Sequence, residues 1–126
     1  MSNKKWEGKT ILLVEDDEIS LEFLKELFEP YKIKIIDVLN GKEAVEVCNT
    51  NPQVDLVLMD VQLPVLNGRD AMKEIKKNRP ELPIIAQTAF AMSGDRERYL
   101  RDGFNNYISK PINVQELMSM IELYFK

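Results

Sequence analysis

Five short apolar runs alternate with five stretches of helical periodicity along this chain of 126 residues. The apolar runs lie at residues 10–14, 32–38, 55–59, 83–88 and 106–110. The helical stretches lie at residues 18–29, 41–50, 68–78, 93–102 and 113–125. Strands that alternate with helices in this way form a parallel sheet with helices on both faces. The pattern predicts a single α/β domain, a doubly wound (βα)5 fold of the flavodoxin-like type, over residues 10–126, with 1–9 as an N-terminal extension.

The composition of the strands also predicts their order in the sheet. Strands buried on both faces of a parallel sheet are continuously apolar, as the first, third and fourth runs are. The second run alternates, with Lys32 and Lys34 facing away from Ile33 and Ile35, and the fifth is mixed, so these two are expected at the edges. Right-handed crossovers then favour the order 2-1-3-4-5. Ligands of such sheets bind outside the carboxyl ends of strands 1 and 3, where the strand order reverses.

The first helical stretch carries one apolar face, which we expect to pack on the sheet. That face is formed by Ile19, Phe23, Leu24, Leu27 and Phe28. The fourth stretch has only two large apolar residues, Tyr99 and Leu100, and such a weakly anchored helix is typical of an element that shifts between two states. An ordinary surface helix is the alternative.

Charge and composition exclude several classes of function. A net charge of −4 and a pI of about 5.0 argue against binding to nucleic acid or to an anionic membrane. No apolar run approaches the roughly 18 residues of a membrane helix, and the first nine residues lack the apolar segment of a signal peptide, so we expect a cytoplasmic location. One cysteine, Cys48, and no histidine leave no basis for a disulfide, a zinc site or a phosphohistidine within the chain.

Acidic residues follow the two strands at the point of reversal. Glu15 and Asp16 come directly after the first strand, and Asp60 ends the third. Carboxylates about 5 Å apart repel by roughly 3 kcal/mol per pair at an effective dielectric constant near 20. A hard divalent cation such as Mg²⁺ offsets this repulsion and leaves positions for phosphate oxygens. Capping of the first helix is the alternative for these acids; we prefer it for Asp17 and prefer metal binding for Asp16 and Asp60.

Two further polar residues end the fourth and the fifth strand. Thr88 ends the fourth strand and offers a hydroxyl, and Lys110 ends the fifth. A lysine there can neutralise the acids or bind a phosphoryl oxygen. The bond to Pro111 is either part of a simple turn or a cis peptide that aims the lysine. An acid pair, a further acid, a hydroxyl and an amine thus meet at one edge of the predicted sheet.

The motifs that hold these residues resemble those of the receiver domains of two-component response regulators. They are "ILLVEDDE" at 11–18, "LMDVQLPVLNG" at 58–68, "PIIAQTAFA" at 83–91 and "YISKP" at 107–111. The resemblance covers essentially the whole chain and leans toward the receivers of hybrid histidine kinases. It implies a phosphoacceptor domain of phosphorelay signalling, which assists its own phosphorylation and dephosphorylation and is otherwise no enzyme.

The resemblance assigns roles residue by residue at the acidic edge. Asp60 is the implied phosphorylation site. Asp16 and Asp60 would bind Mg²⁺ with the backbone carbonyl of Gln62, and Glu15 would act through water. The phosphoryl group would come from a histidine kinase or a histidine phosphotransfer protein, and its hydrolysis would make the domain a timed switch.

The other implied roles concern the switch and the lifetime of the phosphate. Thr88 would hydrogen-bond to the acyl phosphate, Lys110 would pair with it, and Tyr107 would be the aromatic residue that responds. Phe90 and Gln62 occupy positions near the path of the hydrolytic water, and a bulky ring at 90 suggests slow dephosphorylation. By the same resemblance, helix 4, strand 5 and helix 5 form the face for a homodimer or a partner.

Three other functions fit these residues less well. A phosphohydrolase of the haloacid dehalogenase type needs an acid two residues after its nucleophile, where this chain has Gln62. A flavin or nucleotide module needs a glycine-rich or hydroxyl-rich phosphate loop, where this chain has "EDDE". A pseudo-receiver acts only as an interaction surface and would lack some of these functional residues, whereas this chain has the complete set of acids, threonine and lysine. The sequence leaves open the partner, the output, the oligomeric state and whether the domain stands alone or belongs to a larger regulator or kinase.

Overall fold

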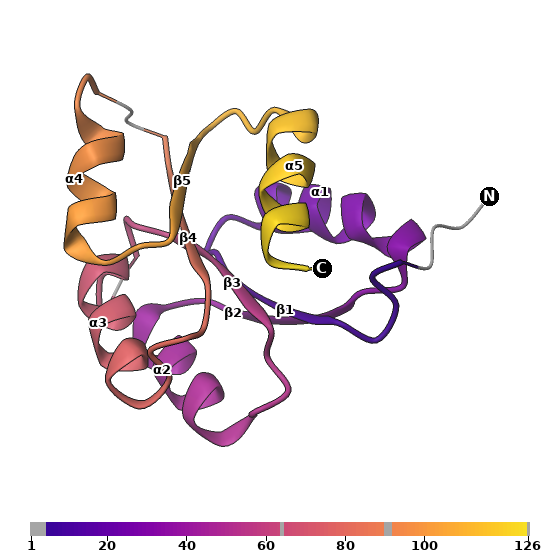
Figure 1. Ribbon diagram of the computed structural model, residues 1–126, viewed down its shortest axis with the longest axis horizontal. Helices are drawn as coiled ribbons and strands as arrows, with labels where there is room; N and C mark the ends of the chain where they lie inside the picture. Colours follow the sequence, from indigo (N-terminus) through magenta and orange to yellow (C-terminus); the bar gives the residue numbers. More distant parts are fainter. Residues whose placement is uncertain (1–4, 64, 90–91, 126) are drawn as a thin grey trace.

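The computed structural model describes residues 5–63, 65–89 and 92–125 and shows a five-stranded parallel sheet between two layers of helices (Figure 1). The strands are β1 (Thr10–Val14), β2 (Lys34–Val38), β3 (Leu56–Asp60), β4 (Ile84–Thr88) and β5 (Asn106–Ser109). Their order in the sheet is β2-β1-β3-β4-β5, and each neighbouring pair is parallel. The predicted fold and strand order are therefore confirmed.

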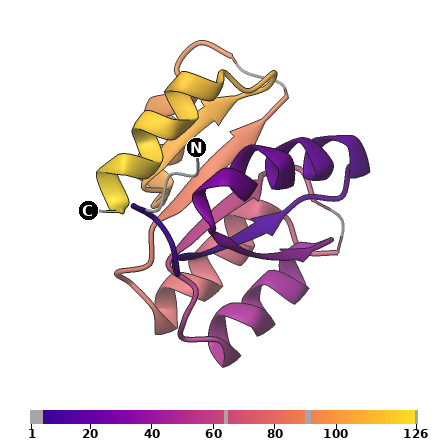
Figure 2. The same cartoon turned by 90° about the vertical axis from the view of Figure 1, so that its right-hand side faces the viewer.

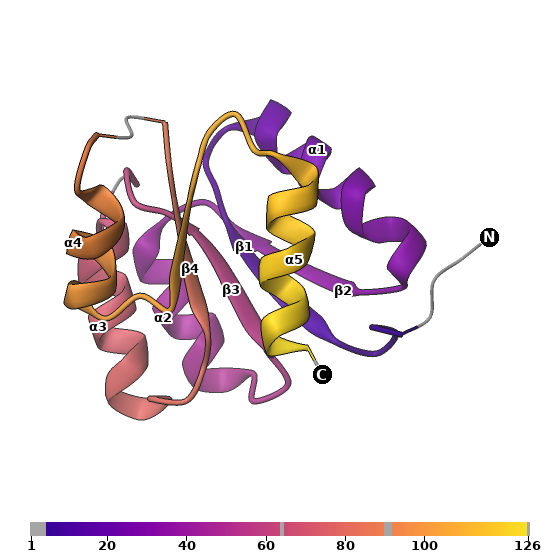
Figure 3. The ribbon, with the colours of Figure 1, turned by 45° about the horizontal axis from the view of Figure 1, so that its top comes forward.

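The helices divide between the two faces of the sheet. They are α1 (Glu18–Phe28), α2 (Gly41–Thr50), α3 (Gly68–Asn78), α4 (Asp95–Asp102) and α5 (Val114–Tyr124), with a 3₁₀ turn, η1, at Glu29–Tyr31. Figures 2 and 3 show α1 and α5 together on one face and α2 and α3 on the other, with α4 beside α3 and β5. Side chains alternate along each strand, so each layer of helices covers its own apolar cluster.

The two clusters contain the large residues of the core. Leu13, Leu58, Ile85 and Ile108 belong to the cluster beneath α1 and α5. Cys48 of α2 is buried in the other cluster, and burial raises the pKa of its thiol to about 11. This cysteine is therefore a core residue, and its thiol is far from reactive at neutral pH.

The residues before β1 are attached to the domain through Trp6. Its side chain is buried at 2% exposure, and its ring centroid lies 4.9 Å from that of Tyr31 and 6.1 Å from that of Phe125. These contacts close the amino end of the sheet. Trp6 is the only tryptophan of the chain, so its emission reports on the folding of this end of the domain.

The predicted start of the second strand was wrong by two residues. β2 begins at Lys34, because Glu29–Tyr31 forms the 3₁₀ turn η1 and Lys32 follows it with a left-handed φ of 59°. Pro30 lies at the start of that turn, where its missing N–H is not needed. The chain therefore turns once more between α1 and β2 before it enters the sheet.

The predicted apolar face of the first helix was also partly wrong. Leu24 and Phe28 are buried, but Ile19 is 81% exposed and Phe23 is 43% exposed, and Leu21 takes part in the core in their place. The first turn of α1 follows directly on the loop at the carboxyl edge, and there it borders the loop after β5 instead of the sheet. Helical periodicity predicts which residues share a face, but not how far the sheet beneath that face extends.

Short polar side chains fix where the helices begin. The Asp17 carboxylate caps α1 by accepting from the backbone N–H of Ser20, as expected for this acid, and Asn113 caps α5 in the same way at Glu116. α4 begins at Asp95, two residues later than predicted, and buries only that residue completely. This weak anchoring of α4 agrees with the prediction made from its sequence. Among the described residues, no helix is both long and apolar enough to cross a membrane.

Candidate functional site

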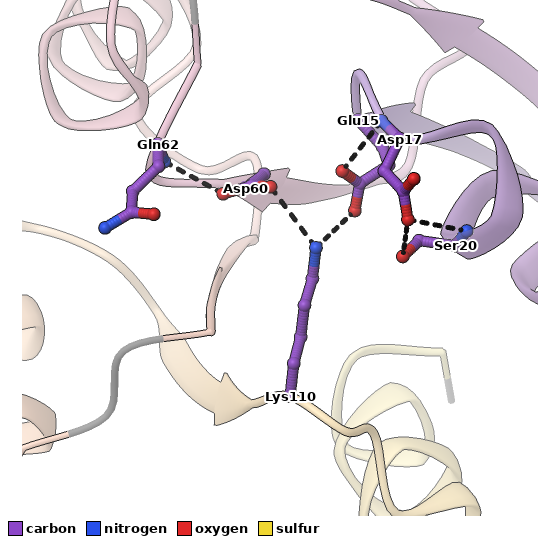
Figure 4. A network of polar contacts seen from close by, with 6 residues as sticks. All are labelled: Glu15, Asp17, Ser20, Asp60, Gln62 and Lys110. Atoms are coloured by element: carbon purple, nitrogen blue, oxygen red, sulfur yellow. Dashed lines mark hydrogen bonds and ion pairs between the residues drawn. The ribbon is translucent and has the colours of Figure 1, made fainter.

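The carboxyl ends of β1 and β3 and the end of β5 meet around one lysine side chain (Figure 4). The Lys110 ammonium donates to Glu15 Oε1 at 2.7 Å and to Asp60 Oδ2 at 3.2 Å. The Glu15 side chain is completely buried, and the Asp60 side chain is 11% exposed. A partly buried cation thus holds two carboxylates from neighbouring strands, as the sequence predicted for this edge.

Strand register brings these residues together. β1 pairs with β3 so that Val14 lies beside Met59, which places the next residues, Glu15 and Asp60, side by side. Thr88 ends β4, is buried, and accepts the backbone N–H of Lys110 at 2.8 Å through its carbonyl oxygen. The Lys110–Pro111 peptide bond is cis, one of the two alternatives left open by the sequence.

Three carboxylates lie close enough to share a cation. Ligand oxygens of Glu15, Asp16 and Asp60 all lie within 4.8 Å of one another, and Asp16 is exposed to solvent while the other two are buried. An all-oxygen set with one open side suits Mg²⁺, which keeps several waters and binds through one or two carboxylates. The residues present therefore fit the metal that the sequence predicted.

Burial and charge act in opposite directions at this site. Burial raises the pKa of Glu15 above its ordinary value, although the hydrogen bond from Lys110 works to lower it. For Lys110, burial lowers the pKa, but the bond to Glu15 and the charges of Asp60 and Glu15 outweigh burial and leave the pKa raised. The ammonium is therefore charged at neutral pH, and each partner depends on the other to remain ionised in a buried place.

Backbone groups orient the two central acids. The N–H of Gln62 donates to Asp60 Oδ1 at 2.8 Å, and the N–H of Asp17 donates to Glu15 Oε2 at 3.3 Å. The loop after β3 passes so close to the strand that a Cβ at Gly68 would lie 2.7 Å from the Asp60 carbonyl oxygen. Asp60 therefore sits in a fixed orientation at the tip of its strand.

Tyr107, the predicted switch residue, is buried on the α4 side of β5. Its ring stacks on that of Tyr99 at a centroid distance of 5.3 Å and an interplanar angle of 18°. Burial raises the pKa of its hydroxyl, and this hydroxyl has no hydrogen-bond partner within 5–63, 65–89 and 92–125. Phe90, which was assigned to phosphate lifetime, lies outside the described residues, while Gln62 has an exposed side chain beside the site.

An apolar groove beside Lys110 was not predicted. It has a volume of about 360 Å³ and lies between the first turns of α1 and the loop from β5 to α5. Its apolar walls are Ile19, Phe23, Pro111 and Ile112. The residues of α1 were assigned to the core because periodicity alone does not separate a buried face from an unpaired one.

A second feature that sequence reasoning missed is Gln87. It lies in β4 beside Asp60 and is fully buried. The signal was present, because "PIIAQT" places an amide within an apolar run, but the run was treated as uniformly buried strand.

The sequence profile of the response regulator receiver domain matches residues 11–122. The polar-differentiation response regulator DivK of Brucella anthropi is 38% identical over 118 residues, which cover 92% of this chain and 95% of DivK. Among solved structures, the receiver domain of sensor histidine kinase PA1611 from Pseudomonas aeruginosa, with magnesium in its active site cleft, has a TM-score of 0.84 at 35% identity and covers 94% of this chain and 98% of that one.

A third relative was solved together with a partner. It is the receiver domain of Ssk1 from Saccharomyces cerevisiae, in complex with the histidine phosphotransfer protein Ypd1. Its TM-score is 0.83 at 28% identity, and the match covers 99% of this chain and 91% of that one.

Proposed function

Because the chain belongs to the response regulator receiver domain family, we propose that Asp60 accepts a phosphoryl group from a phosphohistidine on a partner protein. The observation that supports this proposal most directly is the contact of one partly buried lysine, Lys110, with acids from two strand tips, beside a third acid that is open to solvent. The domain would act as a phosphoacceptor switch in two-component signalling.

The transfer follows from the groups around Asp60. A carboxylate oxygen of Asp60 attacks phosphorus, an O–P bond forms, the N–P bond to the partner's imidazole breaks, and its electron pair returns to that nitrogen. Lys110 lies 3.2 Å from Asp60 Oδ2 and offsets the charge of the phosphoryl oxygens. The Gln62 N–H and Glu15 hold Asp60 and Lys110 in place, so the catalytic contribution is positioning and electrostatics.

Asp16, Asp60 and the backbone carbonyl of Gln62 would hold Mg²⁺, with Glu15 acting through water. The bound ion would neutralise negative charge on the phosphoryl oxygens and between the crowded carboxylates. Thr88, buried at the end of β4, would receive the acyl phosphate with its hydroxyl, and Tyr107 would respond beneath α4.

Mass spectrometry after incubation with acetyl phosphate tests this function. We expect a gain of one labile phosphate on Asp60 that requires Mg²⁺. Stable phosphate on a hydroxyl residue, or no gain with Mg²⁺ present, would reject the proposal.

Asp16→Asn is expected to weaken Mg²⁺ binding by at least about tenfold, because one of the anionic oxygen ligands is lost. Isothermal titration calorimetry is the suitable measurement, since Trp6 lies at the opposite end of the sheet and cannot sense the ion directly. Asp17→Asn is the matched control, because Asp17 caps α1. Equal affinities for Asp16→Asn and the wild-type protein would remove Asp16 from the metal site.

We propose that the apolar groove receives the partner that carries the phosphohistidine. The groove borders Lys110, so a helix seated against Ile19 and Phe23 would bring its histidine to the strand tips. The relative Ssk1 was solved in complex with a histidine phosphotransfer protein, which supports a partner of this class.

Replacing Ile19 and Phe23 together by serine is expected to weaken the binding of a histidine phosphotransfer protein by about 2 kcal/mol, which raises the Kd roughly thirtyfold. Labelling by acetyl phosphate should be unchanged, because this small donor does not use the groove. Leu123→Ser is the control, since Leu123 is 58% exposed and does not line the groove. If phosphoryl transfer from the partner fell equally in Leu123→Ser, or did not fall in the double variant, the partner would bind elsewhere on the domain.

The lifetime of the phosphate provides a further prediction. A ring at residue 90 would screen the acyl phosphate from water. We therefore expect Phe90→Glu to lose phosphate a few-fold faster than the wild-type protein, because the new carboxylate can act as a general base toward the attacking water. The decay of the labelled species in mass spectra after removal of acetyl phosphate measures this rate. A rate no faster than that of the wild-type protein would refute the screening hypothesis.

A further inference from the structure

Gln87 is a buried amide without a hydrogen-bond partner next to the phosphoacceptor residue. Its side chain has 0% exposure, and neither Nε2 nor Oε1 has a partner among the described parts of the chain. Leaving a buried amide unpaired costs free energy, whereas an apolar side chain of similar size would not incur this cost. The amide therefore calls for a role that a packing residue does not fill.

Strand register places Gln87 beside Asp60. The two residues are paired across β3 and β4, and Gln87 is paired with Ile108 across β4 and β5. Because side chains alternate along a strand, Gln87 lies on the same face as Ile85, in the layer beneath α1 and α5. The amide is thus embedded among apolar side chains, with Asp60 as its neighbour on β3.

Lys110 reaches across the same place. It lies two residues after Ile108, directly after the end of β5 at the carboxyl edge of the sheet. From the end of β5, its side chain reaches Asp60 at the end of β3 and Glu15 after β1 (Figure 4), and β4 lies between β5 and β3 in the sheet. Gln87 is the β4 residue that is paired both with Asp60 on β3 and with Ile108 on β5.

Phosphorylation changes the contacts of both neighbours. Lys110 now donates to one Asp60 oxygen and to Glu15, but it must share its protons with phosphoryl oxygens once Asp60 carries the group. An Asp60 oxygen then loses a donor in a buried place. The Gln87 amide is an unpaired donor on the neighbouring strand, at the position paired with Asp60, and it can replace the lost donor.

We propose that Gln87 is a positioning residue for the phosphorylated state. Its Nε2 donates to the Asp60 oxygen that Lys110 leaves, and its Oε1 accepts from the Lys110 ammonium. The amide is unpaired in one state and paired in the other, so it shifts the equilibrium toward the phosphorylated form. This inference rests on the proposed phosphorylation of Asp60.

Gln87→Met tests the inference, because methionine keeps the length and shape and removes the amide. Without ligand, the variant is expected to be more stable, with a Tm raised by about 3–6 °C in Trp6 emission. With Mg²⁺ and beryllofluoride, a mimic of the phosphoryl group, it should bind the mimic about tenfold more weakly than the wild-type protein. Gln87→Leu provides a second variant without an amide, in case methionine packs poorly.

Thr10→Val is the control, since it also makes a buried polar residue of the sheet apolar, but at the amino end of β1. It should leave the affinity for beryllofluoride unchanged. Unchanged affinity in both Gln87 variants, or lower stability of both without ligand, would overturn the inference. Absence of beryllofluoride binding to the wild-type protein would instead reject the proposed function, so the two failures are distinguishable.

Discussion

Asp60→Asn is expected to abolish phosphorylation by acetyl phosphate or by a phosphohistidine partner. The neutral amide is a far weaker nucleophile than a carboxylate, and it removes an anionic ligand from the cation site. The fold should persist, because the amide oxygen can still accept from the Gln62 N–H or from Lys110. Mass spectrometry of the intact protein, with peptide mapping, measures the result.

A neighbouring acid provides the control for this experiment. Asp17→Asn keeps every strand-tip group and changes only the cap of α1, so it should be labelled like the wild-type protein. Phosphate recovered on the Asp60→Asn protein at the wild-type level would show that another residue is the acceptor.

Lys110→Met is expected to destabilise the domain by about 3 kcal/mol, because it leaves Glu15 buried and charged without its cation. Denaturant unfolding followed through Trp6 emission measures this loss. Added Mg²⁺ should restore part of the stability, since a bound cation can replace the missing positive charge among the three carboxylates. Labelling by acetyl phosphate should be slower even at saturating Mg²⁺.

Two further variants separate a buried ion pair from an ordinary one. Glu15→Gln combined with Lys110→Met should recover part of the lost stability, because the fully buried charge of Glu15 is removed together with its cation. Lys25→Met breaks the exposed pair with Asp37 at 2.8 Å and should change stability little. If Lys110→Met and Lys25→Met were equally mild, the contact of Lys110 with Glu15 would not be the constraint that the geometry indicates.

Residues at strand ends were the most predictable part of the site. Apolar runs mark the strands, parallel strands share a carboxyl edge, and the acids and the lysine lie at or directly after the carboxyl ends of their runs. The structure accordingly brings Glu15, Asp60 and Lys110 into direct contact. Their positions follow from local pattern and one rule of topology, so little information about packing was needed.

Ile19, Phe23 and Gln87 were not predictable in this way. Whether an apolar helix residue is covered depends on where the neighbouring elements end, and the loop after β5 leaves Ile19 and Phe23 open. Whether a buried amide finds a partner depends on the side chains that reach it from other strands. Both are properties of contacts between segments far apart in the chain.

The alternation of strand and helix, the strand order and the identity of the acidic edge were all written in periodicity and in the placement of polar residues, because each depends on short segments and on the handedness of their connections. The groove beside Lys110 and the unpaired Gln87 amide arose only when β5, α1 and β4 packed together. Side-chain exposure and hydrogen bonding are settled by neighbours in space, and the chain acquires those neighbours only by folding.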